Sequence, residues 1–246
     1  MMQLFLTIIA YILVITINAL ANILPLNGQT TGEIANRLDV MFTPANYVFS
    51  IWGLIYLLLG IWVIAQFFKK RWKKPLYENT YSYFVISCSF NAMWIIFWHY
   101  EYFLLSVIMM TLLLLTLIAL YRTAKHYNAT FLELVPFSIY LGWISVATIA
   151  NISYYLVYIE WSGWGLSDVT WTFVMLIVAG ILAILFTTTQ RDFLFPGVFI
   201  WAFIGIGLKQ ADVTLISNTA YTISIIIAIS MLILFMIFRK PKATAE

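Results

Sequence analysis

The chain has 246 residues, of which 63% are apolar and only 9% are charged. An ordinary soluble domain has roughly 45–50% apolar and about 25% charged residues, so this composition excludes a water-soluble globule. The net charge is only +3, and the basic residues gather into neither an aromatic-lined groove nor a basic arm, so we expect no nucleic-acid partner.

Charged side chains are costly at the centre of a bilayer, so they mark the places where a membrane chain leaves it. Between them lie eight uncharged windows, at residues 1–32, 40–68, 79–100, 102–121, 134–159, 169–190, 193–208 and 213–238. All but the seventh reach the roughly 20 residues that a helix needs to cross the hydrocarbon. The pattern predicts an all-α, polytopic membrane bundle of eight helices.

The longest excursion between windows is residues 25–46, a polar stretch rich in Gly, Thr and Asn. The seventh window has only 16 uncharged residues and contains Pro196, Gly205 and two further helix-weakening glycines. Either a short tilted span or a re-entrant segment fits this window.

Orientation follows from the Lys and Arg residues. Eight crossings place eleven of them on one side, among them the run at residues 69–74, and leave only Arg37 and Lys209 on the other. Because cytoplasmic loops are enriched in Lys and Arg, we expect both termini in the cytoplasm, in a multi-pass protein of a bacterial cell membrane.

The predicted spans contain no Asp, Glu, Lys or Arg, which leaves little acid–base chemistry inside the membrane. His99 lies at the outer end of the third span, as an interfacial residue or as a proton-handling group. One Cys and two His cannot complete a four-ligand zinc site, and no G-x-S-x-G motif occurs. We therefore expect no metal, no obligatory cofactor and no enzyme.

The spans do contain aromatic and carboxamide side chains at helical spacing. Asn91 and Trp94 share a face of the third span, while Trp143, Ala147 and Asn151 follow one face of the fifth. Two interpretations are open. The amides hold helices together and the indoles form an interfacial belt, or the two groups line a slot for a planar apolar ligand.

Three ordered blocks of sequence resemble the tryptophan-rich sensory protein family, which includes the translocator protein or peripheral benzodiazepine receptor. The first block is Phe42-Thr43-Pro44 followed by Tyr47 to Gly53 and Tyr56; the second is Asn91-Ala92-Met93-Trp94 with Phe97; the third is Leu134 to Phe137 with Trp143, Ala147, Thr148 and Asn151. Departures from the family pattern are Thr43 for the first of two prolines, Tyr47 for a tryptophan, and Phe137 for a tyrosine.

The resemblance covers about residues 1–158 and implies a five-helix core whose long first loop, here residues 25–46, covers a pocket open to the outer side. Residues 159–246 are then about three additional helices of the same membrane domain. By carry-over from the family, the ligand-binding residues are Trp52, Tyr56, Asn91, Trp94, Trp143, Ala147 and Asn151.

The family implies a receptor or sensor that holds porphyrin-like, sterol-like or benzodiazepine-like ligands, with trafficking of the ligand as an additional role. Tyr154 and Tyr155 lack a following Lys or Arg, which argues against sterol binding. A permease for a small neutral or amphipathic solute is the alternative. Photo-oxidation of a bound porphyrin beside Trp52 and Trp143 is a third. The expected partners are the bilayer, a hydrophobic small molecule and a second copy in a homodimer.

Overall fold

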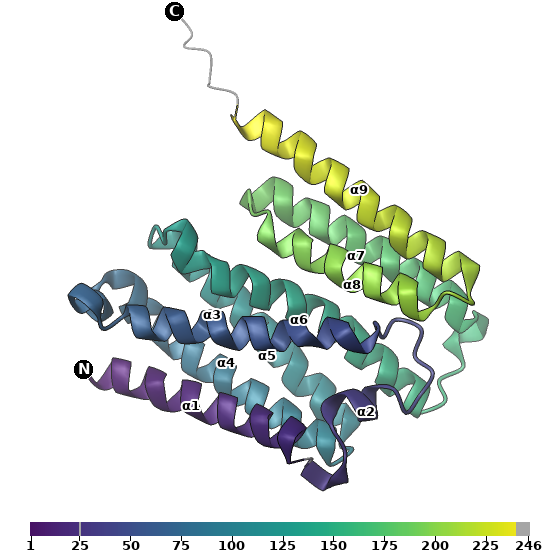
Figure 1. Ribbon diagram of the computed structural model, residues 1–246, viewed down its shortest axis with the longest axis horizontal. Coiled ribbons are helices and arrows are strands. Elements are labelled where there is room, and N and C mark those ends of the chain that lie inside the picture. Colours follow the sequence, from purple (N-terminus) through teal and green to yellow (C-terminus); the bar gives the residue numbers. More distant parts are fainter. Residues whose placement is uncertain (25, 240–246) are drawn as a thin grey trace, which may run out of the picture.

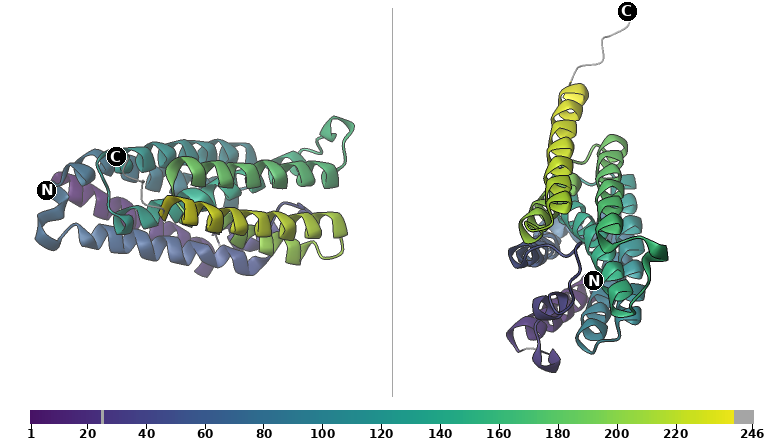
Figure 2. Two further views of the ribbon diagram at one scale, coloured as in Figure 1. Left: turned by 90° about the horizontal axis from the view of Figure 1, so that it is seen from above. Right: turned by 90° about the vertical axis from the view of Figure 1, so that its right-hand side faces the viewer.

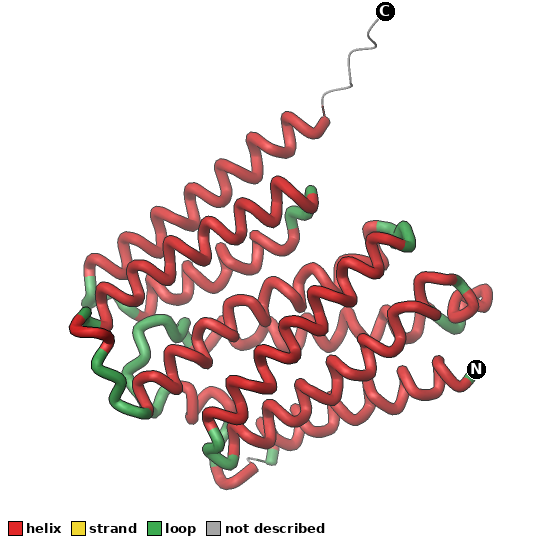
Figure 3. The backbone as a smooth tube through the Cα atoms, turned by 180° about the vertical axis from the view of Figure 1, so that it is seen from behind, coloured by secondary structure: helices red, strands yellow, loops and turns green. Residues whose placement is uncertain are grey.

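The structure is a computed structural model that describes residues 1–24 and 26–239 (Figure 1). Within these ranges it is built from helices, and the connections gather at the two ends of the bundle (Figure 3). The long helices are α1 Met2–Ile23, α3 Ile51–Ala65, α4 Pro75–His99, α5 Phe103–His126, α6 Phe131–Tyr158, α7 Asp168–Gln190, α8 Leu194–Lys209 and α9 Thr214–Arg239. Pro25 of the predicted loop, and Lys240 and Lys242 of the basic count, lie outside the described residues.

Short helical segments occupy the connections. They are η1 Leu26–Gly28, α2 Thr31–Ala35, η2 Asn46–Ser50, η3 Phe68–Lys73 and η4 Gly163–Gly165. The first loop, predicted only as polar, thus contains a helical turn of its own.

Seven helices in the described part of the chain are long and apolar enough to cross a membrane. They are α1, α4, α5, α6, α7, α9 and the continuous stretch Asn46–Ala65, which joins η2 to α3. The protein is therefore a multi-pass, all-α membrane protein, as its composition predicts. Helix α8 is the shorter apolar helix, and it coincides with the seventh uncharged window.

Helix α8 is continuous, and its two ends lie at opposite ends of the bundle. Asp192, just before it, accepts a hydrogen bond from Tyr121 near the end of α5. At its other end, Lys209 donates to Asn36 of the first loop, with an Nζ to Oδ1 distance of 2.8 Å. Sixteen residues of helix cover about 24 Å. Helix α8 thus runs without a re-entrant turn from Leu194 to Lys209, and a short span stays the prediction for the seventh window.

Charged residues are sorted between the two ends as the window pattern predicts. The start of α1, the segment η3 and the end of α9 lie at one end, whereas α2 and η4 lie at the other (Figure 1). Below, the end that carries α2 and η4 is called the loop end, and the opposite end is called the basic end.

Local sequence explains where several helices begin. Thr130 and Glu133 form a capping box at the start of α6, in which each side chain bonds the other residue's backbone N–H. Ser167 caps α7 by accepting from the N–H of Thr170. Pro75 occupies the first turn of α4, where its missing N–H costs nothing. Short local motifs therefore set the first residues of these three helices.

Helices α7, α8 and α9 pack against one flank of the bundle formed by α1 and α3–α6 (Figure 2). The contact runs through α8, where a Cβ on Gly142 of α6 would lie 3.0 Å from the Phe195 carbonyl oxygen and 3.1 Å from Val198 Cβ. Near the loop end, Gly205 of α8 lies against Pro44 and accepts a hydrogen bond from the Ala45 N–H at 3.1 Å. The flanking helices thus contact both α6 and the first loop.

Candidate functional site

Three indoles and a phenol form a row between α3, α4 and α6. Trp52 stacks on Tyr56 on one side and on Trp94 on the other, with a centroid distance of 5.6 Å in each pair. Trp143 meets the Trp52 ring edge-on, at 6.1 Å and 86°. The structure therefore brings the predicted aromatic residues together, although their mutual contacts occupy much of the space that a stacked ligand would use.

Asn91 is a junction between helices. Its side chain is fully buried, and its Oδ1 accepts from Asn18 of α1 at 2.8 Å and from the Tyr56 hydroxyl at 3.3 Å. Its Nδ2 donates to the Tyr140 hydroxyl of α6 at 2.8 Å. These bonds join α1, α3, α4 and α6 and satisfy an amide that hydrocarbon would leave unpaired. At this position the geometry is that of helix association.

Asn151 has a similar role closer to the loop end. It accepts from the Trp94 indole at 3.1 Å and donates to Ser106 of α5, also at 3.1 Å. Asn151 therefore orients the Trp94 ring while it ties α4, α5 and α6 together.

A cavity of about 50 Å³ lies above this row, toward the loop end. Five of the seven predicted site residues line it: Trp52, Trp94, Trp143, Ala147 and Asn151. Tyr56 and Asn91 do not line it and pack against the residues that do. The predicted residues thus separate into a lining layer and a supporting layer.

Two lining residues, Tyr154 and Trp143, have a buried polar atom without a hydrogen-bond partner among the described residues, and Trp143 is the one whose atom is an N–H donor. Its side chain is only 2% exposed, and its Nε1–H has no hydrogen-bond partner among the described residues. A buried donor without an acceptor costs about 1–3 kcal/mol, so such groups call for a specific explanation. A ligand that carries a hydrogen-bond acceptor would supply one.

Residues 26–45 cover the cavity, and Thr31, Ala35, Thr43 and Pro44 of this segment contribute to its lining. The cover includes α2, whose capping box is formed by Thr30 and Glu33. Its apolar side rests on Trp98, which belongs to the same buried cluster as Ile34 and Ala35. The long first loop therefore lies over the aromatic pocket, where the family resemblance places a lid.

His99 anchors this cover to α4. Its Nδ1 lies 3.1 Å from the Leu26 carbonyl oxygen, and its Nε2 lies 3.0 Å from the Thr31 hydroxyl. The Asn27 amide donates to the His99 carbonyl at 3.0 Å. His99 is buried, in contrast to the interfacial residue that its position in the sequence suggested.

An ion pair ties the cover to the α4–α5 turn. Arg37 donates to Glu101 with an Nη1 to Oε1 distance of 2.6 Å. The hydrogen bond from the Arg37 guanidinium lowers the pKa of the Glu101 carboxyl and raises the pKa of Arg37 itself. Both side chains are more than one-third exposed, so water screens the pair.

Sequence reasoning missed several lining residues, among them Phe49, Trp98, Met110 and Tyr154. Helical spacing could have found two of these. Trp98 follows Trp94 by one turn, and Tyr154 follows Asn151 by three residues on the same face. Phe49 and Met110 gave no comparable signal, because apolar residues in a membrane helix face lipid and protein alike. No cluster of three or more His, Cys, Asp or Glu that could hold a metal occurs among residues 1–24 and 26–239.

No curated protein and no solved structure matches the chain. Residues 4–233 match the family described as TSPO-like protein, so the match includes α7, α8 and most of α9 as well as the first five spans. With this match over nearly its whole length, the chain belongs to the TSPO-like protein family.

Proposed function

We propose that this protein is a membrane receptor that binds a planar apolar small molecule, such as a porphyrin, in the aromatic cavity beneath residues 26–45. The observation that carries the proposal is the buried Trp143 indole N–H, which lines the cavity and has no acceptor among the described residues. A planar ligand with a ring nitrogen or carboxylate supplies the acceptor, and the indole faces supply stacking surface.

Binding requires the cavity to enlarge. Small-molecule pockets typically enclose about 300–1,000 Å³, many times the present 50 Å³. The movable wall is residues 26–45, because η1, α2 and the turns around them are short, whereas the opposite walls are long helices. We therefore infer that the ligand displaces this cover or slides the Trp52 ring out of its stack.

Binding, rather than catalysis or driven transport, is the proposed activity. The spans carry aromatic and amide groups, whereas ion-coupled transporters place charged groups or broken helices near the bilayer centre. The finer assignments rest on the sequence: both termini cytoplasmic, a bacterial cell membrane, a role in trafficking the ligand, and a homodimer.

A titration of purified protein in nanodiscs with protoporphyrin IX, followed by quenching of tryptophan fluorescence, tests the proposal. We expect saturable quenching in the wild type. In Trp143→Phe the ligand loses an indole face and a hydrogen-bond donor, so its affinity falls by about 0.5–1.5 kcal/mol for the lost stacking alone. Trp72→Phe, in the short helix η3 at the basic end, is the matched control and should bind normally.

Thermal unfolding of the ligand-free variants separates a loss of binding from a loss of fold. Wild-type affinity in a folded Trp143→Phe protein would contradict the proposed site. Uptake of porphyrin into sealed vesicles against a gradient would instead favour the permease.

A further inference from the structure

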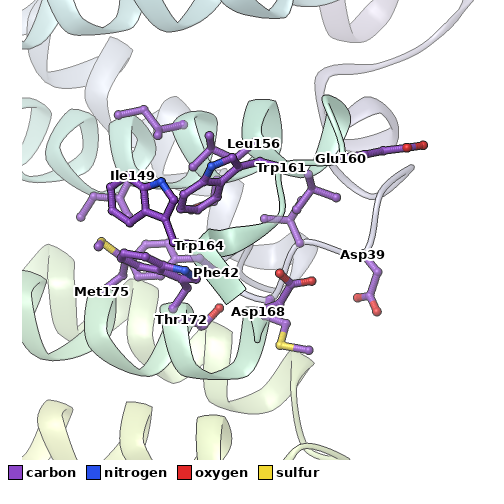
Figure 4. Close-up of a pocket in the computed structure, with 16 residues that line it drawn as sticks. Asp39, Phe42, Ile149, Leu156, Glu160, Trp161, Trp164, Asp168, Thr172 and Met175 are labelled. Carbon is purple, nitrogen blue, oxygen red and sulfur yellow. The ribbon is translucent and has the colours of Figure 1, made fainter. Parts of the chain in front are cut away.

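A second and much larger cavity, of about 740 Å³, lies outside the aromatic pocket, between α6, α7 and the first loop (Figure 4). Its apolar wall comes from Ile149, Ile152 and Leu156 of α6 and from Met175 of α7. Its volume is in the range of small-molecule sites. Helices α1 and α3–α6 alone would form only one wall of this cavity, because α7 supplies the other.

Three indoles gather over this cavity: Trp161, Trp164 and Trp171. Each pair of rings is in contact, with centroid distances of 5.3, 5.4 and 5.8 Å. An interfacial belt needs only single indoles at the level of the lipid head groups. Here the three rings instead form one cluster on a shared wall.

The turn that carries the cluster is held in a specific shape. Trp164 has a left-handed backbone (φ 52°) between Gly163 and Gly165, which both have positive φ, and such a conformation is uncommon for a bulky residue. The Trp171 indole donates to the Gly163 carbonyl at 2.8 Å, which fixes the turn to α7. Trp164 remains 80% exposed, so its ring is available to a ligand.

Three carboxylates complete the lining, from Asp39, Glu160 and Asp168, and the lining contains no Lys or Arg. Among the described residues, neither Glu160 nor Asp168 forms an ion pair. Lys209, the basic residue of α8 at this end, donates to Asn36. In Figure 4, Glu160 and Asp39 lie toward one edge of the cavity, and Ile149 and Met175 lie toward the opposite side.

From this arrangement we propose that the cavity between α6 and α7 binds an amphipathic organic cation with a quaternary ammonium head and an alkyl tail. The indole faces and the carboxylates hold the head, since aromatic cages recognise quaternary ammonium groups through cation–π attraction. The tail lies along Ile149, Ile152 and Met175. An anionic amphiphile would meet Glu160 and Asp168, which form no ion pair among the described residues, in a lining without Lys or Arg, so the site selects by the sign of charge.

Calorimetric titration of the protein in nanodiscs of phosphatidylethanolamine and phosphatidylglycerol tests this assignment, with the signal of empty discs subtracted. The probes are decyltrimethylammonium and decyldimethylamine oxide, which has the same tail and no net charge. We expect saturable binding of the cation, about tenfold tighter than that of the amine oxide.

Variants locate the binding. We expect the affinity for decyltrimethylammonium to fall by about fivefold or more in two variants. One is the double substitution Glu160→Gln with Asp168→Asn, and the other is Trp164→Leu. The matched controls are Asp212→Asn, an exposed carboxylate at the loop end outside the cavity, and Trp72→Leu at the basic end. Trp143→Phe should leave cation binding unchanged, and the double variant should leave porphyrin quenching unchanged, so this site and the proposed receptor pocket can fail separately.

A further titration, in discs that also contain phosphatidylcholine, identifies whether the quaternary ammonium head belongs to a lipid or to a free cation. If phosphatidylcholine added to the discs abolishes binding of decyltrimethylammonium, the occupant is a lipid head group; if binding persists, it is a free amphipathic cation. Equal affinity for the cation and the amine oxide, wild-type affinity in the double variant, or no saturable signal above empty discs would overturn the proposal.

Discussion

Asn18 of α1 and Asn91 of α4 share a hydrogen bond of 2.8 Å between the Nδ2 of the first and the Oδ1 of the second. The two residues are 73 positions apart, and both are buried. The bond fixes α1 against the bundle directly beneath the aromatic row, because Asn91 also contacts Tyr56 and Tyr140. Helix association and the shape of the cavity floor therefore depend on the same amide.

Replacing this amide tests its structural role. Asn91→Ala leaves the hydroxyls of Tyr56 and Tyr140 without their partner in hydrocarbon, so we expect a loss of about 1–3 kcal/mol in stability. Thermal unfolding in detergent measures it. Asn79→Ala is the control on the same helix, since Asn79 is exposed and bonds only the Pro75 carbonyl. Equal melting temperatures for the two variants would contradict the assignment.

His99 should govern how firmly the cover is closed. His99→Phe keeps a ring in place but removes the bonds to the Leu26 carbonyl and the Thr31 hydroxyl. We expect faster hydrogen exchange across residues 26–45, with α5 and α6 unchanged. His126→Phe, at the basic end, is the matched control. In the wild type, bound porphyrin should alter the exchange of residues 26–45, and identical exchange with and without ligand would speak against a lid.

The Arg37–Glu101 ion pair should weaken in acid. The pKa of Glu101 lies below its ordinary value of 4.5 in the closed cover, so the pair contributes its full stability above that value. This contribution is lost as the pH falls through the lowered pKa. A nitroxide label at Thr30, in a Cys88→Ser background, should become more mobile between neutral pH and about pH 3. The effect is at most about 1 kcal/mol, since the pair is exposed, and Glu101→Gln should remove this pH dependence.

The glycine contact between α6 and α8 should tolerate no larger residue. A Cβ at Gly142 presses on the backbone oxygen of Phe195 and on Val198, so Gly142→Val should cost about 1–3 kcal/mol through overpacking. Gly197 of α8 has open space where a Cβ would lie, so Gly197→Val serves as the control. The melting temperatures of the two variants, measured by thermal unfolding, test this expectation. A Gly142→Val protein as stable as the control would mean that the flanking helices are not packed tightly on the core.

We predict eight crossings, with the two ends of the bundle on opposite sides of the membrane. With Cys88 replaced, single cysteines at Thr30 and Gln210 should react with an impermeant thiol reagent added outside cells. Cysteines at Trp72 and Lys242 should react only after permeabilisation. Labelling of positions 30 and 242 from the same side would refute this topology.

The count of eight crossings stays a prediction, because seven helices among the described residues are long and apolar enough to cross a membrane. Sequence alone determined the all-α membrane fold and the order of its helices. These are properties of each helix by itself, because every span must satisfy its own backbone hydrogen bonds in lipid and exclude charge from it. The same argument gave the basic asymmetry, and the motif blocks from Phe42 to Asn151 gave the family. The division of the chain at residue 158 stays a prediction.

Tertiary structure alone decided how the side chains are used. Both faces of a membrane helix are apolar, so periodicity does not tell lipid from protein, and the partners of an amide lie on other helices. Hence Asn91 and Tyr56 support the cavity, whereas Trp143 lines it with an N–H donor that has no acceptor among the described residues. The large cavity likewise exists only because α8, which packs against both α6 and α7, holds these two helices as its opposite walls, and no spacing within either helix encodes that arrangement.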